Sequence, residues 1–236
     1  MPGTAPPPRL VAVTDDALPR TLFSRLAGAV RALGTERLRD TYQTTFWFDF
    51  GRPAALPEEA ILALRGRLPA PARRRVTGVE WWLSRMRTSD VRVDFHRDRD
   101  TALFARTGAT VHPACSSVLY LGRCRGGLLA VTGAPPDEAH PACAPDPLDA
   151  DLVRPWPNRL VLFPGDATHG VLDAHNAVPT GRLPEATPLR LALVMNWWRR
   201  RPEGVRAFAR STRYPALRLP RRVQRANSTP RHAPTC

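Results

Sequence analysis

The sequence contains no lysine, and all 35 of its basic residues are arginines. Together with 26 prolines and abundant alanine, this bias is typical of a GC-rich genome rather than of a surface built for one partner. A formal net charge of +14 would by itself favour a nucleic-acid partner. However, residues 199–236 hold eleven Arg and one acid, Glu203, so this segment carries +10 and the rest of the chain only +4. The charge pattern therefore disfavours a nucleic-acid-binding domain.

Cysteine is scarce and long apolar runs are absent. The four cysteines form no Cys-x-x-Cys pair, and a chain of 236 residues needs no disulfide framework, so we expect free thiols in a reducing cytosol. No stretch approaches the length of a membrane span, and the first residues lack the apolar segment of a signal peptide. We therefore expect a cytoplasmic protein without a membrane partner.

Composition divides the chain into three parts. Residues 1–18 are Pro-rich and expected to be extended, residues 19–201 are expected to form a single domain, and the Arg- and Pro-rich residues 202–236 are expected to form a tail. Inside the domain, apolar residues at helical spacing predict a helix over about 19–33. A proline followed by acidic residues predicts a second, short helix over 57–65.

Short β-like runs make up the body of the predicted domain. Seven of them follow one another, separated mostly by turn residues, at 79–86, 91–96, 115–121, 128–132, 158–163, 169–172 and 189–197. Residues 44–50 are also aromatic and β-prone. No long helical pattern interrupts residues 76–198, so the sequence predicts a mostly antiparallel sandwich or jelly roll. The Pro-rich, acidic residues 133–155 are predicted to be a surface excursion or lid.

A His-x-Asp pair, His96 and Asp98, stands at the end of the second run. Residues two apart in a strand share a face, so one imidazole nitrogen and one carboxylate oxygen can bind the same divalent metal. A second His from elsewhere would complete a facial triad of two His and one carboxylate, which leaves open positions suited to Fe(II) oxygen chemistry. The pair alone is also compatible with a solvated strand end.

His169 is the candidate that best fits the second His. It follows an apolar strand and a Pro164-Gly165 turn, and it begins the next strand, which is a suitable place for a fixed ligand. The other histidines lie in loops or in the tail, where a solvated side chain is the better interpretation; they are His112, His140, His175 and His232.

Arg190 falls inside an otherwise apolar strand, on the face shared with Ala192, Val194 and Asn196. A guanidinium group is costly to bury unless it meets an anion. The anion is either an internal carboxylate, such as Asp94 or Asp49, or the distal carboxylate of a dicarboxylate ligand held by a planar fork of hydrogen bonds.

Several motifs follow one another in an order that spans about residues 40–198. They are Gly78-Val-Glu-Trp-Trp-Leu83, Phe95-His-Arg-Asp98, His112-Pro113, Ser116-Ser-Val-Leu-Tyr-Leu121, Gly126-Gly127, Phe163-Pro-Gly followed by His169-Gly-Val171, and Arg190-Leu-Ala-Leu193. In this order they resemble the 2-oxoglutarate/Fe(II)-dependent dioxygenases, and most closely the prolyl-hydroxylase-like bacterial branch.

The resemblance implies a mostly β fold with flanking N-terminal helices, namely a double-stranded β-helix, or cupin-like jelly roll. It implies His96, Asp98 and His169 as catalytic iron ligands, Arg190 as the partner of 2-oxoglutarate, and Tyr120 as its assistant. The implied activity is hydroxylation of an unactivated C–H bond of a peptide, amino acid or small metabolite by dioxygen, with release of succinate and CO2. Asp100 flanks the ligands, and we favour a solvated strand end for it.

Two departures from the family pattern keep alternatives open. The segment between His169 and Arg190 is longer than prolyl hydroxylases usually show, and it contains Arg182, a rival partner for 2-oxoglutarate. The nucleic-acid dealkylase branch commonly carries a second Arg six positions after the first; this chain has Asn196 there, which disfavours a base-repair function. The alternative functions are a metal-binding β-barrel without oxygenase turnover, and a nucleic-acid-associated protein that acts through its Arg-rich tail.

Overall fold

The computed structural model describes residues 9–35, 44–87, 94–137, 139–140, 146, 149–173, 175, 177 and 188–220. Its strands are β1 (Ala12–Thr14), β2 (Phe46–Phe48), β3 (Gly78–Met86), β4 (Cys115–Tyr120), β5 (Leu128–Thr132), β6 (Asp151–Val153), β7 (Leu160–Phe163), β8 (Thr168–Leu172), β9 (Arg190–Trp198) and β10 (Arg206–Ala207). Its helices are α1 (Arg20–Ala32), α2 (Leu56–Leu64), α3 (Ala70–Arg75) and α4 (Thr101–Thr107), with 3-10 turns η2 (Arg65–Arg67), η3 (Phe208–Arg210) and η4 (Pro215–Leu217).

The strands form two sheets. The large sheet has the order β1-β7-β4-β9-β3-β2-β10, and the small sheet has the order β6-β5-β8. Neighbouring strands are antiparallel except for β10, which runs parallel to β2. From β3 onward the chain passes to and fro between the two sheets, which is the topology of a double-stranded β-helix. The predicted jelly roll is therefore confirmed.

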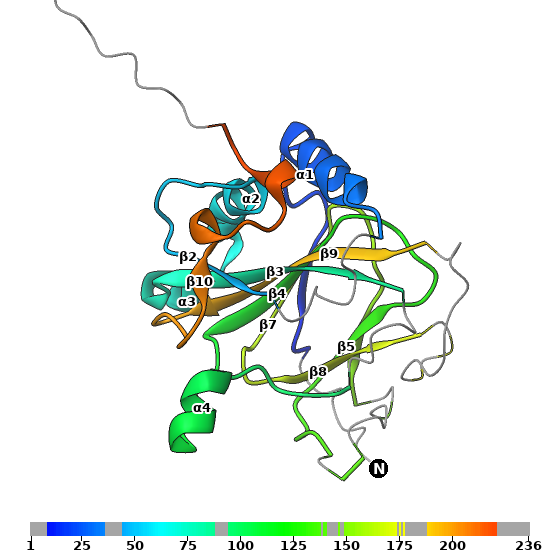
Figure 1. The fold of residues 1–236 in the computed structure, drawn as a ribbon. Helices are drawn as coiled ribbons and strands as arrows, with labels where there is room; N and C mark the ends of the chain where they lie inside the picture. Colours follow the sequence, from blue (N-terminus) through cyan, green and yellow to red (C-terminus); the bar gives the residue numbers. More distant parts are fainter. Residues whose placement is uncertain are drawn as a thin grey trace, which may run out of the picture.

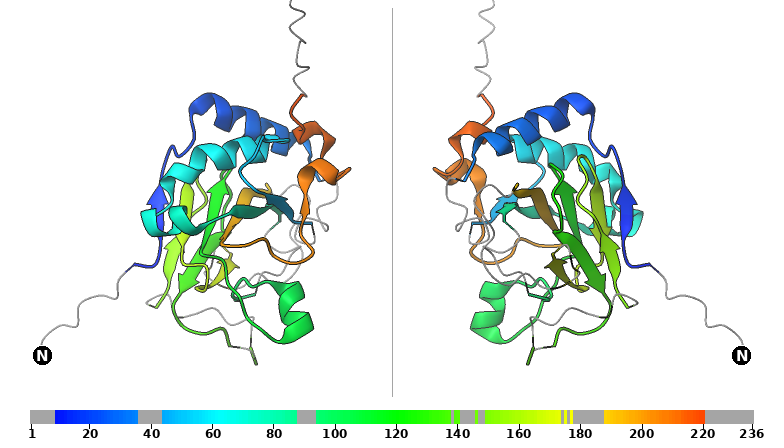
Figure 2. Two further views of the ribbon diagram at one scale, coloured as in Figure 1. Left: turned by 90° about the vertical axis from the view of Figure 1, so that its left-hand side faces the viewer. Right: turned by 90° about the vertical axis from the view of Figure 1, so that its right-hand side faces the viewer.

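Three layers result from this arrangement (Figures 1 and 2). Helices α1 and α2 cover one face of the large sheet, and the small sheet lies against the other face. Side chains of β9 alternate accordingly: Leu191, Leu193, Met195 and Trp197 belong to the apolar cluster under the helices, whereas Ala192 packs between the two sheets. The predicted face of Arg190 is thus the inner one, which points into the space between the sheets.

The predicted helices and most strands are confirmed to within a few residues. The helix expected over 19–33 is α1, and the one expected over 57–65 is α2. Residues 88–93, which contain the first half of the predicted 91–96 strand, lie outside the described part of the chain, but His96 forms an isolated antiparallel bridge with His169 of β8. The short helix α4 and strand β6, which lies in the predicted 133–155 excursion, were not predicted because neither shows a periodic apolar pattern.

The described part of the predicted tail differs from expectation. Residues 202–220 fold onto the domain: β10 pairs with β2, and the side chains of Phe208 and Leu217 are fully buried. Phe208 packs edge-on against Phe46, with ring centroids 5.1 Å apart. Spaced single apolar residues in an Arg- and Pro-rich segment give no periodic signal, yet Phe208, Tyr214 and Leu217 are buried in the apolar cluster and anchor the segment. Residues 1–8 and 221–236 lie outside the described residues.

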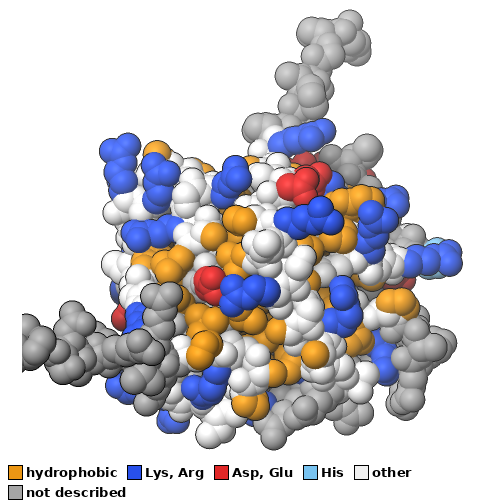
Figure 3. Space-filling model, turned by 90° about the horizontal axis from the view of Figure 1, so that it is seen from above, with side chains coloured by type: hydrophobic (Ala, Val, Ile, Leu, Met, Phe, Trp, Pro, Cys, Tyr) orange, Lys and Arg blue, Asp and Glu red, His pale blue; other side chains and the backbone are white. Residues whose placement is uncertain are grey.

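The surface over the helices shows no single charged stripe. Arg side chains are spread across it, with apolar and acidic side chains between them (Figure 3). Among the described residues, no helix has the length and apolar character needed to cross a bilayer. Cys115 and Cys124 are free thiols, as expected, whereas Cys143 and Cys236 lie outside the described residues.

Candidate functional site

The structure brings His96, Asp98 and His169 together. One ligand atom from each lies within 4.8 Å of the others. The Nε2 atom of His96 is 3.6 Å from Oδ1 of Asp98, and Nε2 of His169 is 3.4 Å from Oδ2. The backbone bridge between the two histidines, with N–H to O distances of 3.0 and 2.9 Å in the two directions, fixes their relative position. Two residues distant in sequence are thus locked side by side.

Both imidazole rings are held by the nitrogen that faces away from Asp98. Nδ1 of His96 lies 2.8 Å from the carbonyl oxygen of Asp94, and Nδ1 of His169 lies 3.1 Å from that of Ala167. A carbonyl oxygen can only accept a hydrogen bond, so each Nδ1 must carry the hydrogen. In the neutral ring each Nε2 then keeps its lone pair. Two imidazole lone pairs and one carboxylate therefore converge on one point, which is the donor set that a divalent first-row metal requires.

Two polar side chains of the large sheet, Ser116 and Asn196, lie next to Asp98. The Ser116 hydroxyl lies 3.4 Å from Oδ2 of Asp98 and donates at 2.8 Å to Oδ1 of Asn196. Ser116 of β4 and Asn196 of β9 are direct cross-strand neighbours. Both side chains are almost fully buried, so they present fixed polar groups to the carboxylate of Asp98. Nothing in the sequence pairs these two residues, because the pairing depends on strand register.

Charges around the triad shift its protonation equilibria. Burial alone would raise the pKa of Asp98, but His169 and His96 outweigh it and lower the pKa to about 2. Burial lowers the pKa of His169. Burial also opposes charge on His96, yet the neighbouring carboxylate of Asp98 raises the pKa of His96 overall. A metal ion at this point therefore meets an ionised carboxylate and one imidazole that is readily neutral.

Arg190 is buried on the inner face of β9, with 3% of its surface exposed. Its Nε donates to the carbonyl of Gly127 at 2.9 Å, one terminal nitrogen donates to the Ser84 hydroxyl at 3.2 Å, and the other lies 3.5 Å from the Tyr120 hydroxyl. A Cβ on Gly127 would lie 2.8 Å from Cδ of Arg190, so glycine is needed there. Among the described residues, no carboxylate forms an ion pair with Arg190, so neither Asp94 nor Asp49 neutralises it.

Tyr120 lies at the same end of the interior as Arg190. It is fully buried, and the guanidinium carbon of Arg190 is 5.1 Å from its ring centroid. Burial raises the pKa of Tyr120, which keeps the hydroxyl protonated. Arg182, the rival that the sequence offered, lies outside the described residues.

His112, His140 and Asp100 lie outside the triad and make different contacts. Nδ1 of His112 lies 2.6 Å from the backbone carbonyl of Asp98, so this histidine tethers the ligand-bearing segment and is not a free loop residue. His140 is exposed and pairs with Asp137. Asp100, expected to be solvated, is only 2% exposed: it caps α4 by accepting from the backbone of Leu103 at 3.1 Å. His232 lies outside the described residues.

Comparisons with known proteins add a likeness of fold. No protein-family model matches the sequence, and no curated protein matches it. Among solved structures, a Pseudomonas putida prolyl-4-hydroxylase is 22% identical, with 82% of this chain and 94% of that chain covered and a TM-score of 0.49. HygX from Streptomyces hygroscopicus, solved with nickel and 2-oxoglutarate bound, is 16% identical, with coverages of 80% and 82% and a TM-score of 0.46.

A third solved structure is an oxidoreductase of the 2OG-Fe(II) oxygenase family from Burkholderia pseudomallei. It is 16% identical, with 84% of this chain and 88% of that chain covered and a TM-score of 0.43. At these identities and TM-scores the likeness assigns no activity to this chain, whose chemistry has to follow from its own residues.

Proposed function

We propose that this protein is an Fe(II)- and 2-oxoglutarate-dependent dioxygenase that hydroxylates a C–H bond of a peptide, an amino acid or a small metabolite. One observation carries the proposal: a buried arginine without a described carboxylate partner shares the space between the two sheets with a converging His-Asp-His donor set. A dicarboxylic keto acid satisfies both at once, because its keto-acid end binds the metal and its far carboxylate neutralises the guanidinium.

Each residue of the site has a role that follows from its surroundings. His96, Asp98 and His169 would hold the metal, which would leave room for 2-oxoglutarate and dioxygen to bind it. Arg190 holds the distal carboxylate by charge-assisted hydrogen bonds, with Ser84 and Gly127 fixing the plane of its guanidinium group. When bound, Fe(II) supplies dioxygen activation that couples the decarboxylation of 2-oxoglutarate to hydroxylation of the substrate.

An anaerobic titration tests this proposal. Purified protein receives Fe(II) and then 2-oxoglutarate, and the weak visible metal-to-ligand charge-transfer band is followed. We expect the band in the wild-type protein and its loss in His96→Ala and Asp98→Ala. Iron binding without a band on addition of 2-oxoglutarate would leave a metal-binding barrel without oxygenase turnover, and the dioxygenase proposal would be withdrawn.

The role of Arg190 has its own test. We expect Arg190→Ala to raise the Kd for 2-oxoglutarate at least tenfold, because the far carboxylate loses a charged hydrogen-bonding partner worth about 1.5–3 kcal/mol. Arg182→Ala is the matched comparison. If Arg182→Ala weakens binding and Arg190→Ala does not, the assignment of Arg190 is wrong.

A further inference from the structure

The register of β3, β9 and β4 arranges the inner face of the large sheet in cross-strand rows. Three successive rows are Glu80, Asn196 and Ser116; then Trp82, Val194 and Val118; then Ser84, Ala192 and Tyr120. The first row adjoins the candidate metal ligands, because the Ser116 hydroxyl lies 3.4 Å from Asp98. The third row contacts the guanidinium group of Arg190. Along the strands, the middle row therefore lies between the metal-binding triad and Arg190.

The middle row is open to solvent although it faces the space between the sheets. Trp82 and its cross-strand neighbour Val194 are both partly exposed. In the flanking rows Glu80 is also partly exposed, whereas Ser84 and Asn196 are buried. A partly exposed apolar pair inside a jelly roll, with polar groups on either side, is typical of a small-molecule site. The inner face thus leaves room for a bound molecule beside Trp82.

The indole nitrogen of Trp82 is a buried donor. Its Nε1 atom is shielded from solvent, and no described residue accepts its hydrogen. The indoles of Trp197 and Trp198, by contrast, donate to Ser117 at 2.8 Å and to Glu80 at 3.2 Å. Folded proteins satisfy nearly all such groups, because a buried N–H without an acceptor is unfavourable. A ligand that brings an acceptor to the middle row would remove this cost.

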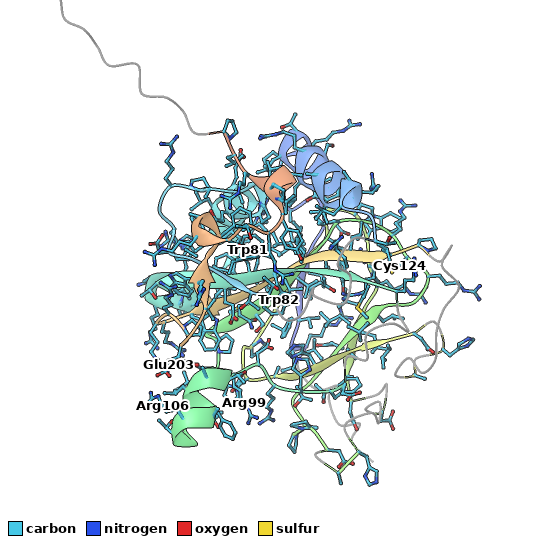
Figure 4. All side chains as sticks on the ribbon, in the orientation of Figure 1. Trp81, Trp82, Arg99, Arg106, Cys124 and Glu203 are labelled. Carbon is cyan, nitrogen blue, oxygen red and sulfur yellow. The ribbon has the colours of Figure 1, made fainter. Side chains whose placement is uncertain are left out.

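The neighbouring Trp81 faces away from the site. Its Nε1 atom also lacks an acceptor among the described residues, but its ring belongs to the apolar cluster under α1 and α2. Figure 4 shows the two tryptophans on opposite sides of β3, with Trp81 toward the helices and Trp82 toward the small sheet. Of these two indoles, only that of Trp82 is directed into the space that holds the triad and Arg190.

The chemistry of the indole group restricts what it can bind. An indole N–H only donates, so Trp82 binds neither a metal ion nor a cationic group through this atom. Its strongest partner is a negatively charged oxygen, which forms a charge-assisted hydrogen bond. Successive rows are about 7 Å apart along a strand, so a side chain in the middle row reaches a molecule that joins the two outer rows. 2-Oxoglutarate carries a carboxylate at each end and has this extent.

We propose that Trp82 positions 2-oxoglutarate, with its indole N–H donating to a carboxylate oxygen of the bound keto acid. The inference rests on the proposed function and adds a second donor to that of Arg190. Arg190 lies on β9 and Trp82 on β3, so two different strands hold the keto acid. Donors from two directions fix its orientation relative to the metal ligands, which a single guanidinium group does not.

The first test is an NMR titration of the wild-type protein. Zn(II) takes the place of iron, so that no turnover occurs, and the six tryptophans are labelled with 15N in the indole ring. Nuclear Overhauser contacts with the methyl groups of Val194 assign the Trp82 signal. We expect saturation with 2-oxoglutarate to move the indole proton signal of Trp82 downfield, because a charge-assisted hydrogen bond deshields the proton. The signal of the exposed Trp156 is expected to stay in place.

A variant measures the contribution of the donor. Trp82→Phe keeps an aromatic ring and removes the N–H, so we expect the Kd for 2-oxoglutarate, measured by calorimetry on the Zn(II) protein, to rise at least tenfold. Zn(II) affinity is expected to be unchanged, which separates loss of the donor from a general loss of structure. Trp156→Phe is the matched control and is expected to alter neither value.

A truncated keto acid identifies the end that Trp82 binds. 2-Oxopentanoate keeps the chain length of 2-oxoglutarate and lacks the far carboxylate. If Trp82→Phe weakens 2-oxoglutarate but not 2-oxopentanoate, the indole binds the far carboxylate; if it weakens both equally, the indole binds the carboxylate at the metal.

Two results would overturn the inference: a Trp82 signal that does not move at saturating 2-oxoglutarate, or a Trp82→Phe protein with the wild-type Kd. Both differ from failure of the proposed function, in which the wild-type protein gives no charge-transfer band and binds no 2-oxoglutarate, and both proposals fall. Because the NMR titration uses the wild-type protein, it decides the matter even if Trp82→Phe does not fold.

Discussion

At the scale of single residues, Ser116 and Asn196 orient Asp98 although neither is itself a candidate metal ligand. Ser116 and Asn196 hold Asp98 through a short polar chain in an otherwise apolar interior. Outer contacts of this kind orient a ligand and fix its charge. The neighbouring Ser117 points to the other side of β4, where it accepts a hydrogen bond from Nε1 of Trp197 at 2.8 Å.

These two serines make a matched pair for experiment. We expect Ser116→Ala to weaken Fe(II) affinity about tenfold, because Asp98 and Asn196 lose their shared hydroxyl. Ser117→Ala is expected to leave the metal affinity unchanged and to lower stability by about 1–3 kcal/mol, since the Trp197 N–H loses its buried acceptor. Competition with a chromophoric chelator and denaturant unfolding measure the two effects. Equal metal affinities in both variants would contradict the role given to Ser116.

The raised pKa of Glu80 predicts that the stability of the folded protein depends on pH. Its pKa is raised from the ordinary value of 4.5 to about 7, so between these values the folded protein holds a proton that the unfolded chain releases. Stability therefore falls as pH rises through this window. In the metal-free protein, we expect Glu80→Gln to be near neutral at pH 4 and stabilising by about 1–3 kcal/mol at pH 8. Denaturant unfolding at both pH values checks the sign, and a stability gain larger at pH 4 would refute it.

The sequence predicts those site residues that can be identified without knowing how the strands pair. The spacing of His96 and Asp98, the turn before His169 and the misfit of Arg190 in an apolar strand each predicted a site residue, and the structure brings the first three together. The surroundings of Glu80, by contrast, cannot be predicted without the pairing of β3 with β9, because its neighbours come from other strands.

At the scale of elements, the connection between β7 and β8 is packed unusually closely. A Cβ built on Gly165 would lie 2.2 Å from the carbonyl oxygen of Pro113. Pro113 follows His112, whose ring contacts the Asp98 carbonyl. The turn that leads to His169 thus lies directly against the backbone of Pro113, next to the histidine that contacts Asp98. The positions of His169 and Asp98 are therefore coupled through this backbone contact.

Gly165→Ala tests this coupling. Because the contact is with backbone, we expect the methyl group to cost about 1–3 kcal/mol of stability and also to weaken Fe(II) binding. Gly66→Ala is the control, since nothing lies within 4 Å of its Cβ position. Thermal unfolding and chelator competition measure both effects. A Gly165→Ala protein with wild-type stability would show that the turn yields without strain.

Elements with a regular apolar pattern were predicted well, and those held by tertiary contact were not. Strands β3 and β9 carry long alternations, and both were placed within one residue or so of their observed bounds. Helix α4 is only seven residues long and is fixed by the Asp100 cap and Gly108, whose φ of 74° ends it. Short elements of this kind take their stability from neighbours, which the sequence pattern does not reveal.

At the scale of the whole molecule, residues 205–219 close one side of the domain. Phe208, Tyr214 and Leu217 pack into the same apolar cluster as α1 and α2. The sequence assigned them to a tail, since Arg and Pro dominate the segment. Residues 205–213 also form part of the wall of a cavity of about 860 Å³ beside α4.

A pair of truncations measures what this segment contributes. A chain that ends at residue 204 loses three buried side chains, so we expect a loss of about 3–6 kcal/mol. A chain that ends at residue 220 keeps all three and serves as the reference. Thermal unfolding of the two proteins decides the matter. Equal melting temperatures would mean that residues 205–219 add nothing to the fold.

The order of strands in the large sheet also bears on how the protein is made. Strand β9 lies between β3 and β4, although about 70 residues separate it from β4 in the sequence. During synthesis, β3 and β4 leave the ribosome well before the strand that joins them, so each emerges with an unpaired edge. Until β9 is synthesised, the nascent chain therefore carries apolar strands with unpaired edges, which favours aggregation during this interval.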